Sequence, residues 1–132
     1  MTALAGLRVL VVEDNILIAL DIEQTLQGLG CVVVGPVGKL DAALRMADEE
    51  ALDAALLDVN IRGGHVYPVA ERLRARGIPF ALASGYGDWA IPEEFQNQRR
   101  LSKPFTTREL EMQVLSLYRE KVTGDGGEEL GS

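Results

Sequence analysis

The chain has 132 residues, of which 47% are hydrophobic and 25% charged, a composition typical of one globular domain. Its formal charge of −7 opposes binding to nucleic acid phosphates and to anionic membranes. A single cysteine, Cys31, and a single histidine, His65, exclude an internal disulfide, a thiolate zinc cage and a multi-histidine metal site. Carboxylates are therefore the candidates for any chemistry.

The beginning of the chain lacks the features of a signal peptide. Residues 1–12 have no basic start before the apolar run, and two acids follow it directly. No uncharged apolar stretch approaches the ~20 residues that cross a bilayer, so we expect a cytoplasmic protein. The excess of acids lies in the first half of the chain: residues 1–61 hold ten acids and three bases, whereas residues 62–132 hold ten of each.

Short apolar runs alternate with segments of helical periodicity, a pattern typical of parallel strands joined by crossover helices. The expected strands are residues 7–12, 31–34, 54–57, 78–83 and 99–102. The first helix should open near Asn15, and the last at Thr106, where Thr106 and Glu109 fit a capping box. Residues 58–64 predict a loop. Residues 85–97 contain helix breakers and predict only a short or irregular helix.

Five strands in so short a chain cannot close an eight-stranded barrel, so the sequence favours an open, doubly wound α/β sheet with helices on both faces. We expect a flavodoxin-like (βα)5 fold with parallel strands in the order 2-1-3-4-5. Residues 123–132 are glycine-rich and acidic, and they predict a disordered tail after a domain of residues 1–122.

Reactive side chains follow four of these strands: Glu13 and Asp14 the first, Asp58 the third, Ser84 the fourth and Lys103 the fifth. If the first and third strands are neighbours, three carboxylates face one another, and they cannot all stay ionised unless a cation shares the site. An all-oxygen site suits Mg²⁺ or Mn²⁺ rather than zinc. Such a site could accept a phosphoryl group: Asp58 would attack in line, and Lys103 and Ser84 would bind the remaining charge.

These residues resemble, position by position, those of the receiver domains of two-component response regulators. Glu13 and Asp14 correspond to the acidic pair, Asp58 to the phosphoacceptor, Ser84 to the hydroxyl switch, and Lys103 with Pro104 to the Lys-Pro pair. The resemblance covers residues 7–118. It implies a histidine kinase as phosphoryl donor and Mg²⁺ held by Glu13, Asp14, Asp58 and the backbone carbonyl of Asn60. It also implies a cis peptide before Pro104.

Two features depart from the usual receiver pattern. Arg100 stands three residues before Lys103, where most receivers have an aromatic that turns inward on phosphorylation. Residues 82–87, LASGYG, resemble the Phe-Ala-Thr-Gly-Tyr-Gly sequence of the single-domain FAT GUY receivers, with Leu and Ser in place of Phe and Thr. That subclass implies a kinase of the HWE type. Tyr86 could gate access to Asp58 or simply cover the loop. Arg100 fits a solvated sheet edge better than a switching or docking role.

The sequence therefore predicts a stand-alone receiver that signals by protein contact through its fourth helix, fifth strand and fifth helix, or that drains phosphoryl groups from a kinase. It would be a phosphoacceptor rather than an enzyme. One alternative is a haloacid-dehalogenase-like phosphatase, which uses a strand-end aspartate with Mg²⁺ but needs a second aspartate where this chain has Asn60. Another is a pseudo-receiver that binds partners without phosphorylation, against which the intact acidic set argues.

Overall fold

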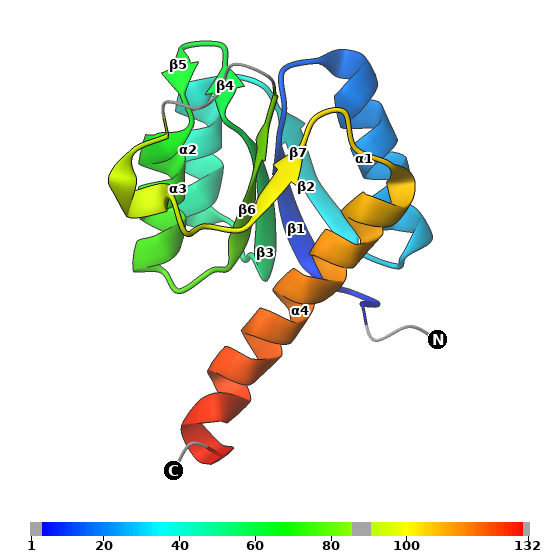
Figure 1. Ribbon diagram of the computed structural model, residues 1–132, viewed down its shortest axis with the longest axis vertical. Coiled ribbons are helices and arrows are strands. Elements are labelled where there is room, and N and C mark those ends of the chain that lie inside the picture. Colours follow the sequence, from blue (N-terminus) through cyan, green and yellow to red (C-terminus); the bar gives the residue numbers. More distant parts are fainter. Residues whose placement is uncertain (1–3, 86–90, 131–132) are drawn as a thin grey trace.

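Five parallel strands form the central sheet of the computed structural model, which describes residues 4–85 and 91–130, and side chains as far as residue 123 (Figure 1). The strands lie in the order β2-β1-β3-β6-β7, which confirms the predicted 2-1-3-4-5 arrangement by position. Their bounds are β1 Arg8–Val12, β2 Val32–Val37, β3 Ala54–Asp58, β6 Phe80–Ser84 and β7 Arg100–Ser102.

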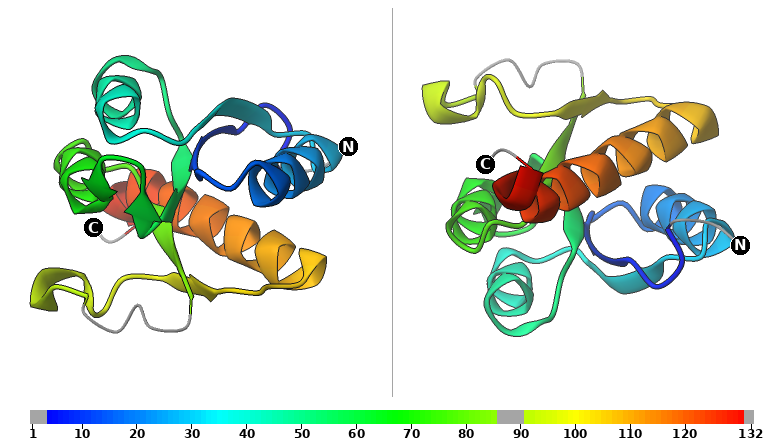
Figure 2. Two further views of the ribbon diagram at one scale, coloured as in Figure 1. Left: turned by 90° about the horizontal axis from the view of Figure 1, so that it is seen from above. Right: turned by 90° about the horizontal axis from the view of Figure 1, so that it is seen from below.

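Helices cover both faces of this sheet, as predicted. α1, Ile16–Gly28, and α4, Thr107–Leu130, lie on one face, and α2, Leu40–Glu49, and α3, Tyr67–Ala75, lie on the other (Figure 2). Each face has its own hydrophobic core. All five residues of β3 are buried, because this central strand packs against helices on both sides.

Side-chain caps fix the starts of α1 and α4. The Asn15 side chain accepts hydrogen bonds from the backbone N–H groups of Leu17 and Ile18, at 3.0 and 3.1 Å. Thr106 and Glu109 form the predicted capping box: the Glu109 N–H donates to the Thr106 hydroxyl, and the Thr106 N–H donates to the Glu109 carboxylate, at 3.0 and 2.8 Å. The predicted helix starts are therefore confirmed.

The described part of the connection between β6 and β7 contains a 3₁₀ turn, η1, Glu93–Phe95, where the sequence predicts a short or irregular helix. Its anchor is Phe95, which is fully buried and stacks on Tyr67 with ring centroids 5.5 Å apart. Residues 86–90 lie outside the described part of the chain, and the predicted gate Tyr86 is among them.

A small hairpin replaces the loop predicted after the third strand. β4, Asn60–Ile61, pairs antiparallel with β5, Gly64–His65. Gly63 in the turn and Gly64 at the start of β5 adopt φ angles of 100° and 136°, a backbone conformation that other residues rarely adopt. The hairpin stands at the carboxyl end of β3 (Figure 1).

The last helix is longer than the sequence predicts. α4 continues to Leu130, through most of the segment expected to be a disordered tail. A helix that is already nucleated gains one hydrogen bond for each residue added, so it can continue past the residues that pack. Lys121 still contacts the body of the domain through an ion pair with Asp53 at 3.0 Å, and the final turns project beyond the sheet (Figure 1). The domain boundary at residue 122 stays a prediction. No helix in the described ranges has the length and apolar character to span a membrane.

Candidate functional site

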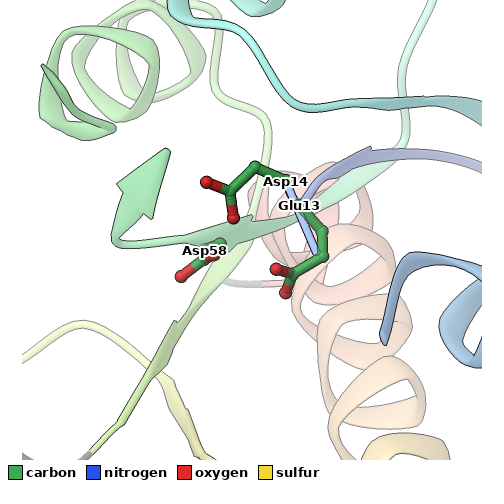
Figure 3. A group of neighbouring side chains, drawn as sticks. All are labelled: Glu13, Asp14 and Asp58. Carbon is green, nitrogen blue, oxygen red and sulfur yellow. The ribbon is translucent and has the colours of Figure 1, made fainter. Parts of the chain in front are cut away.

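Three carboxylates meet at the carboxyl edge of the sheet. Glu13 and Asp14 directly follow β1, and Asp58 ends the neighbouring strand β3, whose register places Leu57 opposite Val12. One oxygen from each carboxylate lies within 4.8 Å of the others (Figure 3). Glu13 and Asp58 are buried and Asp14 is half-buried. The parallel order of the strands thus brings together acids that are 44 residues apart in the chain.

Lys103 completes this group, which we call the acidic pocket: Glu13, Asp14, Asp58 and Lys103. The Lys103 ammonium Nζ lies 2.8 Å from Oε1 of Glu13 and 3.2 Å from Oδ2 of Asp58. Its backbone N–H donates to the Ser84 carbonyl at 2.8 Å, which ties the end of β7 to the end of β6. The Lys103–Pro104 peptide is cis, as the family resemblance implied. The predicted lysine therefore reaches the predicted acceptor.

Burial and like charge make the pocket electrostatically strained. Burial and the neighbouring Glu13 carboxylate raise the pKa of Asp58 from 3.8 to about 7, although Lys103 opposes that shift. Burial alone would lower the pKa of Lys103, but its contacts with Glu13 and Asp58 outweigh burial and raise it. One ammonium therefore leaves the carboxylates short of positive charge.

The donor set fits a hard divalent cation. Oε1 of Glu13 is buried and accepts no hydrogen bond of normal geometry, despite its short contact with Lys103. Buried polar atoms are normally satisfied, so this oxygen has capacity for another partner. The ligands on offer are carboxylate oxygens, which Mg²⁺ and Mn²⁺ prefer. The acidic pocket is thus able to hold such an ion.

Asn60 lies beside the pocket on β4. Its backbone N–H donates to Oδ1 of Asp58 at 3.3 Å, and its side-chain oxygen lies 2.9 Å from Nδ1 of His65. The ring of His65 also packs against Tyr67, with ring centroids 5.9 Å apart. An amide at position 60 cannot supply the proton that the phosphatase alternative requires. Metal binding by the Asn60 carbonyl stays a prediction.

Ser84 and Arg100, two further predicted site residues, lie on β6 and β7. Ser84 ends β6 opposite Ser102, at the same edge as Asp58, and its hydroxyl role stays a prediction. Arg100 begins β7 with an exposed side chain, and its Nη2 donates to the Gln96 carbonyl at 2.9 Å. Its position agrees with the predicted sheet edge.

Gly38 supports the pocket and was not singled out from the sequence. A Cβ atom at this position would lie 2.9 Å from the Asp14 Cα and 3.3 Å from the Glu13 carbonyl oxygen. Only a hydrogen fits there, so Gly38 lets the segment after β2 pack directly against the two acids. The Glu13 N–H donates to the Val37 carbonyl in the same contact, at 2.9 Å. The expected strand ended at residue 34, whereas β2 ends at Val37, so no signal in the sequence marked Gly38 as a neighbour of the two acids.

The comparisons with known proteins agree with this geometry. Residues 9–115 match the model of the response regulator receiver domain. SdrG from Sphingomonas melonis Fr1 is 41% identical, with a TM-score of 0.76 over 89% of this chain and 98% of that chain. No curated protein matched the sequence.

A receiver domain that contains a metal is also similar. The receiver domain of the sensor histidine kinase PA1611 from Pseudomonas aeruginosa is 26% identical, with a TM-score of 0.72 over 89% of this chain and 98% of that chain. That structure has a magnesium ion coordinated in its active-site cleft. The family model covers most of the sequence, and Glu13, Asp14, Asp58 and Lys103 share one pocket. This chain therefore belongs to the response regulator receiver domain family.

Proposed function

We propose that Asp58 accepts a phosphoryl group from a histidine kinase and that the chain acts as a stand-alone response regulator. The observation that carries this proposal is the acidic pocket, in which a buried aspartate lies 3.2 Å from a lysine ammonium and within 4.8 Å of two further carboxylates. A carboxylate nucleophile needs no general base, which suits a chain with a single histidine.

In the proposed reaction one oxygen of Asp58 forms a bond to phosphorus as the bond from phosphorus to the kinase histidine nitrogen breaks. The imidazole keeps the electron pair of that bond, and Asp58 becomes an acyl phosphate. The Lys103 ammonium is already within contact distance of Oδ2 of Asp58, so it can bind the oxygens of the transferred group without a large movement. Ser84, at the adjacent strand end, would bind another of these oxygens.

The acidic pocket needs additional positive charge to keep Asp58 ionised. With a pKa of about 7, Asp58 is only partly ionised at neutral pH, and the protonated acid is not a nucleophile. Glu13, Asp14, Asp58 and the Asn60 carbonyl would hold Mg²⁺ or Mn²⁺. When bound, this ion neutralises carboxylate and phosphoryl charge. We therefore expect the reaction to depend on a divalent cation.

The partner assignments rest on resemblance. Residues 82–87 resemble the FAT GUY sequence, which supports a single-domain receiver and a kinase of the HWE type in the cytoplasm. The signal would leave by contact with a downstream protein, or the domain would serve as a phosphate sink. A structure of SdrG in its BeF₃-activated conformation is also similar, with 40% sequence identity to this chain. Beryllofluoride is therefore a suitable probe here.

The test is incubation of the full chain with acetyl phosphate or beryllofluoride, with and without Mg²⁺, followed by intact-mass measurement and amide NMR spectra. We expect one phosphoryl group per chain, only with the cation, and amide shifts near Asp58, Ser84 and Lys103. The Asp58→Asn variant should show neither change.

Asp21→Asn on the exposed surface of α1 is the matched control and should respond like the natural chain. Modification that survives Asp58→Asn would refute Asp58 as the acceptor. Absence of modification and of shifts with every donor, in a folded protein, would instead support the pseudo-receiver. Turnover of a generic phosphate ester over many cycles would support the phosphatase.

A further inference from the structure

Asn60 and His65 form a cross-strand pair beside the acidic pocket. They lie directly opposite each other in the β4–β5 hairpin, and Nδ1 of His65 lies 2.9 Å from Oδ1 of Asn60. A carbonyl oxygen only accepts hydrogen bonds, so the imidazole donates this bond and carries a hydrogen on Nδ1. A side-chain hydrogen bond therefore joins the two strands as well as their backbone pairing.

A ring contact restrains the imidazole as well. The centroid of the His65 ring lies 5.9 Å from that of Tyr67, and the two ring planes are tilted by 32°. Tyr67 is the first residue of α3 and is half-buried, whereas His65 and Asn60 are exposed. The imidazole is thus held between the first turn of α3 and the side chain of Asn60.

Backbone pairing alone holds this hairpin weakly. β4 and β5 have two residues each, and a two-stranded hairpin is at best marginally stable in water. The Val66 N–H donates to the Val59 carbonyl at 2.9 Å, which closes the base of the hairpin. The contact with His65 differs from this bond because it acts on Asn60 itself.

Asn60 is the residue through which the hairpin reaches the acidic pocket. Its backbone N–H donates to Oδ1 of Asp58 at 3.3 Å, while Nζ of Lys103 lies 3.2 Å from Oδ2. Its carbonyl is a proposed ligand of the divalent cation. We infer that His65 is a positioning residue: its hydrogen bond holds Asn60, whose backbone serves both Asp58 and the cation. This inference rests on the proposed function, since it concerns the same site.

His65 acts through Asn60 and not as a ligand. Among the described residues, the carboxylates that could share a metal ion are those of Glu13, Asp14 and Asp58, and the imidazole is not in their group. Mg²⁺ and Mn²⁺ also bind oxygen in preference to imidazole nitrogen. Residues that orient a metal ligand typically change metal affinity by about 10–100-fold when they are removed.

The experiment compares two variants of His65 in the full chain, with Mg²⁺ affinity measured by calorimetry. His65→Phe keeps an aromatic ring for Tyr67 but has no donor, so its affinity should fall about tenfold. His65→Asn loses the ring but keeps an N–H donor at the side-chain position of Nδ1, so its affinity should stay within about threefold of the natural value. Without the cation, the backbone amide of Asn60 should exchange with solvent faster in His65→Phe than in His65→Asn.

Two controls separate positioning from stability. Gln24→Phe, on the exposed surface of α1, also adds an exposed ring and should change Mg²⁺ affinity less than about twofold. Urea unfolding with a chelator should give the same midpoint for His65→Phe and the natural chain, because the side chain at position 65 is exposed.

Equal Mg²⁺ affinity for His65→Phe and the natural chain would overturn the inference. An equal loss of affinity in both variants would also overturn it, because the donor would then be irrelevant. A lower urea midpoint for His65→Phe would show that His65 stabilises the hairpin instead of positioning Asn60. These results would leave the proposed function intact, since intact mass measures phosphorylation of Asp58 separately. A natural chain that binds no Mg²⁺ would overturn the inference together with the proposed dependence on a cation.

Discussion

The acidic pocket and the β6–β7 connection, residues 85–99, lie at neighbouring parts of one sheet but are built in different ways. In the pocket, each acidic side chain follows or ends a buried strand, and the strand register sets its position. In the described part of the connection, residues 85 and 91–99, there is one turn of 3₁₀ helix, whereas the other crossovers have helices of 9 to 13 residues. The strand register positions the pocket, whereas the described part of the connection is held by the buried Ile91 and Phe95 and by side-chain hydrogen bonds such as that from Gln98 to the Phe80 carbonyl.

This difference suggests that the two regions respond separately to mutation. Phe95 contacts Tyr67 and Phe80 through its ring, and the Arg74 guanidinium lies over it at 4.4 Å from the centroid. None of these four residues belongs to the acidic pocket. Damage at Phe95 should therefore reduce stability without changing the ligands at the strand ends.

The largest expected effect is that of Phe95→Ala. Removal of this fully buried ring should lower the free energy of unfolding by about 3–5 kcal/mol, because a cavity remains where the ring was. Urea unfolding measures the loss. At a temperature where the variant is still folded, we expect its Mg²⁺ affinity by calorimetry to stay within about twofold of the natural value.

Phe95→Leu is the control, because it keeps most of the apolar volume, and it should lose less stability than Phe95→Ala. A variant that is folded but binds Mg²⁺ tenfold more weakly would contradict the separation of the two regions. It would show that the connection helps to hold the strand ends in place.

The second effect concerns the pocket alone. Gly38→Ala should lower the free energy of unfolding by roughly 2 kcal/mol, because its Cβ would overlap the Asp14 backbone. This overlap would displace the backbone of Glu13 and Asp14, which are two of the proposed metal ligands, so the affinity for Mg²⁺ should fall at least tenfold. Urea unfolding and calorimetry measure the two losses.

Gly28→Ala is a matched control, since no atom lies within 4 Å of the position where its Cβ would be built. Alanine is the better helix former at this site in α1, so stability should stay equal or rise, with Mg²⁺ affinity unchanged. Equal Mg²⁺ affinity for Gly38→Ala and the natural chain would show that the acids tolerate movement of their backbone.

The same contrast explains what the sequence could predict. Given the flavodoxin-like strand order, the meeting of Glu13, Asp14, Asp58 and Lys103 follows from buried apolar runs that end in polar residues, because parallel neighbours present their carboxyl ends together. The close approach of Gly38 to Asp14 could not be derived, since it depends on how the segment after β2 crosses β1. The position of Phe95 likewise depends on ring contacts with residues distant in the chain, which leave no local periodicity.

The last effect is a pH dependence of stability in the absence of divalent cations. The shift of the Asp58 pKa corresponds to about 4 kcal/mol at most, and we expect on the order of 1 kcal/mol because Glu13 and Lys103 share the titration with Asp58. The pKa of Asp58 rises from 3.8 to about 7 on folding, so the folded state binds the proton more tightly than the unfolded state. The natural chain should therefore lose stability as pH rises from about 4 to 8. Asp58→Asn removes this loss. The stability of the variant relative to the natural chain should therefore be greater at pH 8 than at pH 4, as measured by urea unfolding with a chelator.

The difference between the two chains isolates Asp58 and its coupling to Glu13 and Lys103, because the titrating groups outside the acidic pocket are common to both chains and largely cancel. Asp21→Asn should follow the pH curve of the natural chain. Saturating Mg²⁺ binds the folded natural chain and should restore its stability at pH 8, while Asp58→Asn should gain less. A constant difference between the natural chain and Asp58→Asn from pH 4 to 8 would mean that the buried acceptor is already neutralised by Lys103. In that case the cation would be needed for phosphoryl transfer itself and not for ionising Asp58.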